Sequence, residues 1–307
     1  MTARPVALVG VTASGKSALA MELARRLGDV ELVSVDSMQV YRGMDIGTAK
    51  PTPADRAEVP HHLLDLVDPW EAFDLHEFQQ AVRAALADIE RRGRRAILVG
   101  GTGLYLRSVV DDLDLPGRYP DVAAELDADP DTGALHRRLT GLDPLAASRM
   151  EPTNRRRVVR ALEVTLGSGR PFSSFGPGLD QYGPSRIDLV GLWRPRPVIA
   201  ERIAARYAEQ MAAGFLDEVR RLAEGPPLSH TASQALGYRE LLAHVRGECG
   251  LDAALDEAVR RTRRFARRQR VWFRRDPRIT WFGADRDPMV VLPLLLRHLG
   301  ESRAANR

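Results

Sequence analysis

The feature that most constrains the fold of this chain is a glycine-rich loop near its N-terminus. The loop Gly10-Val-Thr-Ala-Ser-Gly-Lys-Ser17 matches G-x-x-x-x-G-K-[ST] in full, and it lies between an apolar run and a helical pattern. Its backbone N–H groups and the helix N-terminus should form a nest for phosphate oxygens. Lys16 adds charge at the terminal phosphates, and the Ser17 hydroxyl can bind Mg²⁺. We predict a phosphate-binding loop that uses Gly10, Thr12, Ala13, Ser14, Gly15, Lys16 and Ser17.

Short apolar runs alternate with helical patterns along most of the chain. We expect strands at 6–9, 31–35, 96–99 and 187–192, and helices at about 15–27 and 75–92. This alternation predicts an α/β fold, a P-loop NTPase-like parallel sheet flanked by helices. Ligands of such sheets gather at the carboxyl ends of the strands. Gly10, Asp36 and Thr102 follow strand ends, so they should meet in one crevice.

Asp36 directly follows the second predicted strand. Many P-loop proteins carry an Asp for magnesium at the end of a hydrophobic strand, but here the third strand ends in Gly100-Gly-Thr-Gly103. A carboxylate that faces the phosphate loop is well placed as a general base on an acceptor. It could equally cap the turn that follows the strand. The spacing alone leaves both roles open.

The composition changes between about residues 113 and 185. Residues 111–131 hold eight acids and one arginine, and a Gly-, Pro- and Ser-rich stretch follows at 167–184. We predict a helical insertion domain at 113–185 within a core domain at 1–112 and 186–307. Helices are expected at about 198–224 and from about 232 onward, with a last short strand at 280–282.

Positive charge is concentrated in one C-terminal segment. The net charge is +4, and nine arginines between residues 260 and 275, with no acid among them, contribute +9, so the remainder carries −5. This pattern favours a polyanionic partner. Alternatively, these arginines form a solvated helix face, and the arginine excess reflects a GC-rich genome. The only lysines are Lys16 and Lys50.

Several classes of protein are disfavoured by the sequence. The single cysteine, Cys249, permits no intrachain disulfide and fits a reducing cytoplasm. No apolar run reaches the roughly 18 residues of a membrane span, so we expect no membrane partner. His61-His62 has no Cys or carboxylate at ligand spacing beside it, and we interpret the pair as structural.

Several blocks of the sequence resemble those of tRNA dimethylallyltransferases, in the same order. The longest runs from Asp36-Ser-Met-Gln-Val-Tyr to Lys50-Pro51, and the phosphate loop is also similar. The others are Pro60–Asp65, Val99–Tyr105, Arg160–Glu163, Gly214-Phe215 with Glu218-Val219, Gly237-Tyr238 and Ala266–Phe273.

The resemblance implies transfer of a dimethylallyl group from dimethylallyl diphosphate to N6 of the adenine 3′ of the anticodon (position 37), in tRNAs reading codons that begin with U. The loop would hold the leaving diphosphate, with Mg²⁺ as cofactor. Asp36 would accept the proton, and Thr102 would bind near the diphosphate or the attacking nitrogen. The catalytic arginine is assigned to Arg202, with Arg206 one turn later as the rival.

The resemblance also implies contacts with the anticodon stem-loop of tRNA. Gln39 would pair with an adenine edge. Ala123 stands where the family usually has an arginine. The residues expected to contact tRNA are Asp36, Ser37, Met38, Gln39, Thr102, Ala123, Arg156, Arg157, Val158, Val159, Arg160, Gln234, Gly237, Tyr238 and Arg239. We expect a monomer.

Three other functions remain open from the residues alone. The chain could prenylate free adenine nucleotides, although a small acceptor does not need the insertion or the basic segment. It could be a P-loop kinase for a small metabolite. It could also be a non-catalytic RNA-binding module, which would leave the phosphate loop and Asp36 unexplained.

Overall fold

The structure, a computed structural model, describes residues 4–176 and 178–304. The chain divides into two compact units, one of residues 1–110 and 184–307 and one of residues 111–183. The sequence placed these boundaries at 112/113 and 185/186. No helix in the described part combines the length and hydrophobicity needed to span a membrane.

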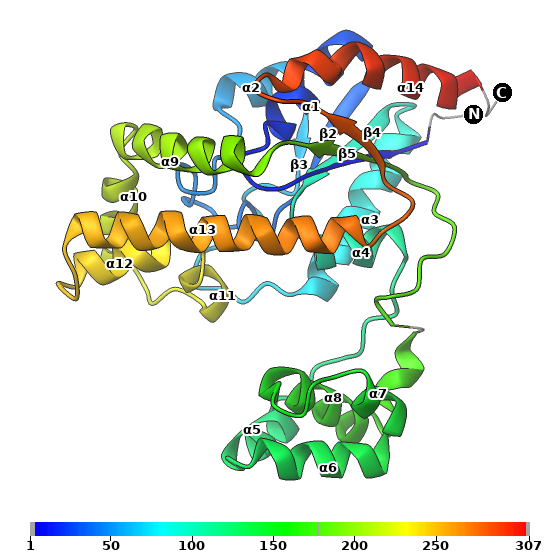
Figure 1. Ribbon diagram of the computed structural model, residues 1–307, viewed down its shortest axis with the longest axis vertical. Helices are drawn as coiled ribbons and strands as arrows, with labels where there is room; N and C mark the ends of the chain where they lie inside the picture. Colours follow the sequence, from blue (N-terminus) through cyan, green and yellow to red (C-terminus); the bar gives the residue numbers. More distant parts are fainter. Residues whose placement is uncertain (1–3, 177, 305–307) are drawn as a thin grey trace. The chain divides into compact units, whose positions relative to one another are not determined.

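The larger unit is built on a parallel sheet of six strands in the order β3-β2-β4-β1-β5-β6 (Figure 1). This confirms the predicted fold class. Val9 lies opposite both Gly100 and Gly191, and Val35 lies opposite Gly100, so the central strands end in register. The strands are β1 (Val6–Val9), β2 (Val30–Val35), β3 (His61–His62), β4 (Arg95–Gly100), β5 (Asp188–Trp193) and β6 (Thr280–Gly283).

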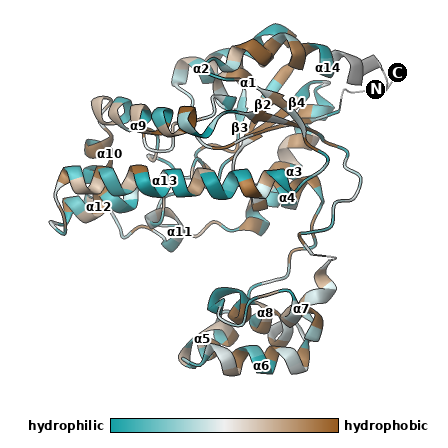
Figure 2. Ribbon diagram, viewed as in Figure 1, coloured by the Kyte–Doolittle hydropathy of each residue, from teal (hydrophilic) through white to brown (hydrophobic). Residues whose placement is uncertain are grey.

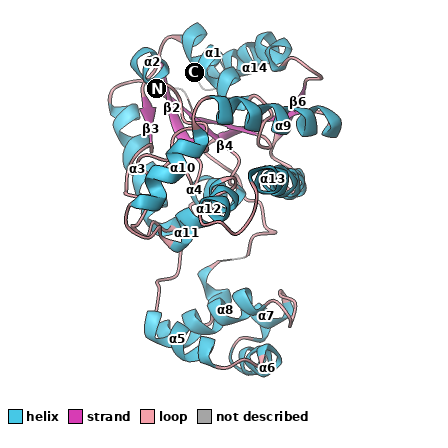
Figure 3. Ribbon diagram, turned by 90° about the vertical axis from the view of Figure 1, so that its left-hand side faces the viewer, coloured by secondary structure: helices cyan, strands magenta, loops and turns pink. Residues whose placement is uncertain are grey.

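Helices cover both faces of the sheet, because alternate residues of its strands point to opposite sides. Leu8 and Ile97 pack against α1 and α14 on one face, whereas Ala7 and Leu98 belong to the core beneath α3, α9, α12 and α13. Figure 3 shows the strands between these two helical layers. The helices are α1 (Lys16–Leu27), α2 (Pro53–Glu58), α3 (Leu75–Arg91), α4 (Gly103–Val110), α9 (Arg196–Ala212), α10 (Phe215–Glu224), α11 (His230–Ser233), α12 (Tyr238–Val245), α13 (Leu251–Arg274), η2 (Pro288–Val291) and α14 (Leu292–Ala304).

One predicted helix is two in the structure. The stretch expected at 198–224 breaks between α9 and α10, where Gly214 has φ 94° and serves as the N-cap of α10. A backbone in this left-handed region cannot continue a helix and strongly favours glycine.

The smaller unit is helical and has its own apolar core. Leu126, Leu135, Leu139 and Leu162 form that core with their neighbours. The Glu163 carboxylate accepts a hydrogen bond from the Tyr119 N–H at 2.8 Å and thereby ties α8 to the start of α5. The elements are α5 (Pro120–Ala128), α6 (Thr132–Leu142), α7 (Pro144–Ser148), α8 (Arg155–Ser168) and η1 (Phe172–Phe175).

Candidate active site

The phosphate loop joins β1 to α1 in the conformation of an anion nest. Ala13 (φ 59°) and Gly15 (φ 92°) are left-handed, and the Ser14 N–H donates to the Val11 carbonyl at 3.2 Å. A Cβ on Gly15 would lie 2.8 Å from the Pro288 side chain, so only glycine fits there. The Ser14 hydroxyl is buried and has no hydrogen-bond partner among the described residues.

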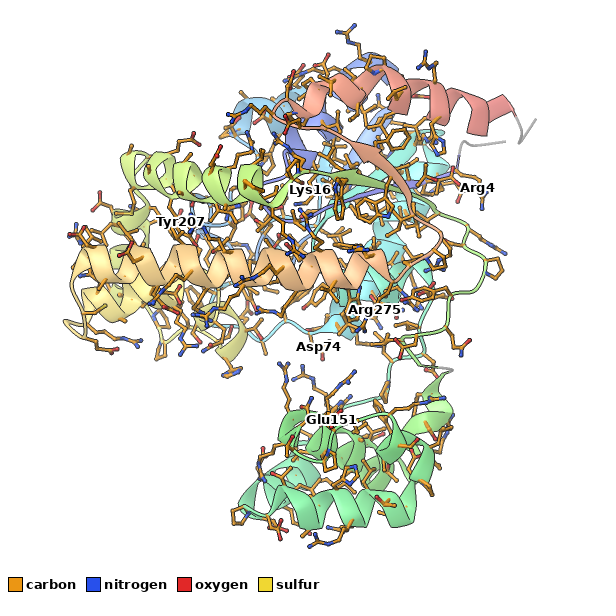
Figure 4. All side chains as sticks on the ribbon, in the orientation of Figure 1. Arg4, Lys16, Asp74, Glu151, Tyr207 and Arg275 are labelled. Carbon is orange, nitrogen blue, oxygen red and sulfur yellow. The ribbon has the colours of Figure 1, made fainter. Side chains whose placement is uncertain are left out.

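Lys16 is the first residue of α1 and is labelled in Figure 4. Its ammonium group donates to the Val11 carbonyl at 3.4 Å. Burial lowers the pKa of Lys16 to about 8. The negative charge of Asp36 opposes this shift, and the positive charge of Arg206 adds to it. Lys16, Asp36 and Arg206 therefore act on one another at one site, as the sequence predicted for Lys16 and Asp36.

Two arginines of α9 contact the phosphate loop. The Arg202 Nε donates to the Ala13 carbonyl at 2.9 Å, and Arg206 Nη1 donates to the Thr12 hydroxyl at 2.9 Å. Arg202 is exposed, whereas burial lowers the pKa of Arg206. Because the two side chains are one helical turn apart, both can reach an anion at the loop.

Asp36 directly follows β2, and Thr102 is the second residue after β4. The Asp36 Oδ1 accepts a hydrogen bond from the Met38 N–H at 2.9 Å, which is the turn-capping geometry considered above. The Thr102 carbonyl accepts from the Leu106 N–H at 3.0 Å in the first turn of α4. A Cβ on Gly100 would lie 2.1 Å from the Val35 carbonyl oxygen, so glycine permits these two strand ends to approach.

Two residues that hold the site together were not predicted as site residues from the sequence. Gln269 of α13 accepts from the Thr12 N–H and donates to the Gly101 carbonyl, both at 2.8 Å, and so bridges the loops after β1 and β4. Arg194 is 1% exposed and donates to the Ser14 carbonyl at 3.1 Å. Arg194 directly follows β5, and this place at a strand end could have identified it as a site residue.

The block from Asp36 to Pro51 is braced from within the larger unit. The Glu218 carboxylate accepts from the backbone N–H groups of Asp45, Ile46 and Gly47, at 2.8–3.2 Å, and from the Tyr238 hydroxyl. Lys50 is ion-paired with Asp45 and Asp65 at 2.7 and 2.6 Å.

The structure changes the interpretation of several predicted RNA contacts. Tyr238 and Val158 are 0% exposed and Val159 is 8% exposed, so the side chains of these three predicted contact residues are buried within the protein. They fill the cores beneath α12 and α8. The Gln39 amide accepts from the Ser34 hydroxyl at 2.7 Å and donates to the Thr48 and Ala49 carbonyls. Its hydrogen bonds are therefore used within the protein.

The other predicted contact residues are more open to solvent. Arg156 and Arg157 are exposed on α8, whereas Arg160 donates to the Pro116 and Gly117 carbonyls. Arg239 donates to the Gln234 side chain at 3.0 Å, and both are exposed or partly exposed. Of the remaining ones, Ser37, Met38 and Ala123 are partly buried. Gly237 is an exception, because it is buried and serves as the N-cap of α12 with φ 86°.

The histidine pair has structural partners. His61 Nδ1 lies 2.7 Å from the Val59 carbonyl, and His62 Nε2 lies 2.7 Å from the buried Glu31 carboxylate. Burial raises the pKa of Glu31, but hydrogen bonds from Arg92 and His62 outweigh it and lower the pKa to about 2. Residues 4–176 and 178–304 contain no group of three or more His, Cys, Asp or Glu side chains that could hold a metal ion.

Comparisons with known proteins give one consistent family. The family model described as IPP transferase matches residues 39–276. The tRNA dimethylallyltransferase of Streptomyces coelicolor is 50% identical over 301 residues, which is 95% of each chain. A tRNA isopentenylpyrophosphate transferase from Bacillus halodurans superposes with a TM-score of 0.72 at 37% identity, covering 99% of both chains. A eukaryotic dimethylallyltransferase acting on tRNA gives a TM-score of 0.82 at 25% identity, covering all of this chain and 80% of that one.

Proposed function

Because this chain belongs to the IPP transferase family, we propose that it transfers a dimethylallyl group from dimethylallyl diphosphate to N6 of an adenine in tRNA. The acceptor in this proposal is the adenine 3′ of the anticodon in tRNAs that read codons beginning with U. The products are N6-isopentenyladenosine and diphosphate. The names of the S. coelicolor and eukaryotic relatives support the reaction class.

The observation that carries this proposal is the meeting of one carboxylate with a cationic phosphate loop. Asp36 and Arg206 both act on the charge of Lys16. A donor whose diphosphate lies on the loop would have its allylic carbon in the same site as Asp36. The same carboxylate can then receive a proton from an amine that attacks this carbon.

The proposed step balances as a substitution. The allylic C–O bond breaks and its electron pair leaves on the diphosphate, where Lys16, the loop amides and the arginines at the loop stabilise the charge. The adenine N6 forms the new C–N bond, and one of its protons passes to Asp36.

The residues at the loop fit Mg²⁺ as a cofactor that is held mainly by the donor. Ser17 is exposed in the first turn of α1 and offers one hydroxyl. Mg²⁺ keeps several waters and commonly uses one or two protein oxygens together with substrate phosphates. Bound there, the ion would neutralise charge on the leaving diphosphate.

The proposal includes an RNA partner and a simple assembly state. Arg156 and Arg157 on α8 are exposed cations suited to RNA phosphates. The adenine must leave its stack to reach the phosphate loop, so base flipping is part of the proposal. We expect the enzyme to act as a cytoplasmic monomer.

The test compares acceptors and one variant. The wild-type protein with dimethylallyl diphosphate and Mg²⁺ should prenylate unmodified tRNA, whereas AMP should be a poor acceptor and ATP should not be hydrolysed. Asp36→Asn should lower the rate by about 10²- to 10⁴-fold and leave binding of the donor largely intact. Asp217→Asn removes an exposed carboxylate on α10 and is the matched control. The proposal would be contradicted if the Asp36 variant prenylated tRNA efficiently, or if the wild-type protein did not prenylate tRNA.

A further inference from the structure

Arg194 is a buried cation beside the phosphate loop. It directly follows β5, and it is 1% exposed. Figure 2 shows the strands of the sheet as largely hydrophobic, so the charge of Arg194 stands at the edge of an apolar region. Burying a guanidinium group is costly unless its N–H groups find partners. The contacts of Arg194 therefore indicate what the protein gains from a charge at this place.

The guanidinium group of Arg194 holds three backbone carbonyls at once. Its Nη1 donates to the Ser14 carbonyl of the phosphate loop at 3.1 Å. Its Nε donates to the Asp285 carbonyl at 2.9 Å, and its Nη2 donates to the Arg286 carbonyl. A guanidinium group suits this task, because its N–H groups diverge within one plane. Arg194 thus connects the phosphate loop to residues 284–288, which we call the η2 segment.

The η2 segment packs against the same turn of the phosphate loop. A Cβ on Gly15 would lie 2.8 Å from the Pro288 side chain and 3.8 Å from Arg194 Nη1. The Ala284 N–H donates to the Trp193 carbonyl at 2.9 Å, so the η2 segment is also tied to the end of β5. The Ser14–Gly15 turn is therefore supported by two contacts that come from distant parts of the chain.

The hydrogen bond to the Ser14 carbonyl fixes the direction of the next N–H group. In a trans peptide the carbonyl and the N–H of the following residue point in opposite directions. Because Arg194 holds the Ser14 carbonyl, the Gly15 N–H points away from Arg194. Gly15 has φ 92°, and a glycine backbone can adopt several other conformations at little cost. A contact that holds this carbonyl therefore decides whether the Gly15 N–H is available to an anion.

The preceding carbonyl of the loop is also held by an arginine. Arg202 donates to the Ala13 carbonyl at 2.9 Å, so two consecutive carbonyls have guanidinium partners. Burial lowers the pKa of Arg194, the positive charge of Arg202 adds to this shift, and Asp285 and Asp287 oppose it. Arginine side chains stay protonated in proteins, so both remain cations. An anion at the loop would reduce the repulsion between these two charges.

We propose that Arg194 is a positioning residue for the diphosphate. It acts through the Ser14 carbonyl, sets the Gly15 N–H toward a phosphate oxygen, and adds a positive charge beside the loop. A loop that is ordered before the ligand arrives loses less conformational entropy on binding. The inference rests on the proposed function for the identity of this diphosphate as the leaving group of the prenyl donor.

The test measures the binding of inorganic diphosphate, with Mg²⁺ present, by calorimetry. Arg194→Met keeps a long unbranched side chain but removes the charge and the donors of all three hydrogen bonds. The Kd for diphosphate should rise at least about tenfold, which is the scale of one hydrogen bond that involves a charged group.

Arg95→Met is the matched control for the loss of a buried arginine. Arg95 is 2% exposed and donates to the Arg4 carbonyl at 2.9 Å. It begins β4, at the end of the sheet opposite to the phosphate loop. Both variants should have a lower Tm than the wild type, because each loses buried hydrogen bonds. Only Arg194→Met should lose affinity for diphosphate, and equal Kd values for the two variants would reduce the role of Arg194 to stability and overturn the proposal.

A lysine variant separates position from charge. Arg194→Lys keeps the positive charge, but a single ammonium group cannot hold three diverging carbonyls. Its Kd should remain several-fold above that of the wild type. A wild-type Kd would mean that charge alone is sufficient, and it would overturn the positioning role. If either methionine variant does not fold, Arg194→Lys and Arg95→Lys give the same comparison, and Arg95→Lys should bind diphosphate as the wild type does.

The outcomes separate this inference from the proposed function, because diphosphate binding needs no prenyl transfer. If tRNA is prenylated but Arg194→Met binds diphosphate as tightly as the control, the assignment of Arg194 is wrong and the reaction stands. If Arg194→Met loses affinity but the wild type does not prenylate tRNA, the assignment stands and the reaction is wrong. A wild-type protein that binds no diphosphate would overturn the assignment.

Discussion

Replacing Gln269 with leucine should loosen the phosphate loop and the loop after β4 together. Gln269 is 6% exposed and serves the Thr12 N–H and the Gly101 carbonyl, both at 2.8 Å. Leucine fills a similar volume but leaves both groups without this partner. Leaving the buried Gly101 carbonyl without a hydrogen bond should cost about 1–3 kcal/mol. Leaving the Thr12 N–H without one should cost about 1 kcal/mol, because this group is closer to water. The free energy of unfolding of the larger unit should therefore fall by about 2–4 kcal/mol.

Thermal unfolding and donor kinetics measure the two consequences of this substitution. For a domain of this size each kcal/mol lowers the Tm by about 2–4 °C, so Gln269→Leu should lower it by about 4–16 °C. The KM for dimethylallyl diphosphate should rise, because the Thr12 segment would no longer be fixed. Gln80→Leu, at an exposed position of α3, is the matched control.

The reasoning is refuted if Gln269→Leu has the Tm and the donor KM of the control. A second variant separates the two hydrogen bonds. Gln269→Glu keeps an acceptor for Thr12 but loses the donor to Gly101. A protonated carboxyl can donate again, so the folded state should raise the pKa of the new glutamate. The variant should then be stabilised at low pH and lose that stability as the pH rises through this pKa.

Two further predictions concern the charge of Lys16 and the core of the smaller unit. Diphosphate binding should weaken as the pH rises through about 8, because Lys16 loses its proton there. Calorimetry at pH 8 in buffers of different ionisation enthalpy should show that binding takes up about half a proton. A binding constant that does not change from pH 7 to 9 would exclude this role of Lys16. Val158→Ala should lower the free energy of unfolding by about 1–3 kcal/mol, since the residue is fully buried, whereas Arg157→Gln should weaken tRNA binding and leave stability unchanged. If Val158→Ala instead weakened tRNA binding without a loss of stability, and Arg157→Gln lowered stability without weakening tRNA binding, Val158 would be the contact residue.

The central sheet was predictable from sequence because its strands are short, buried and bounded by glycine or polar residues. The 6–9 strand matches β1, and the expected strands at 31–35 and 96–99 lie within β2 and β4. The two-residue strand β3 was missed. Its pairing with β2 at Leu32 and Val33 is a long-range feature that periodicity over two residues cannot reveal.

The candidate site was predictable where it follows local rules and not where distant helices contribute. Lys16 and Asp36 follow from a loop motif and a strand end. Gln269 lies 257 residues from its partner Thr12, so only the tertiary structure brings the two together. Tyr238 and Val158 show a different limit, because blocks that resemble RNA-contacting segments also contain residues whose side chains are buried, and sequence similarity does not separate the two kinds.

The two lysines of this chain give it an unusual reactivity toward amine-selective reagents. Lys50 is held by two carboxylates and its side chain is 1% exposed, so acylating reagents should reach it slowly. Lys16, with a pKa of about 8, is half deprotonated at that pH and is therefore the more nucleophilic of the two. Acylation of lysine at mildly alkaline pH should thus report on one side chain, and a bound diphosphate should shield it. On the lysines of this protein, a reagent that modifies dozens of sites on a lysine-rich protein would act as an active-site titrant.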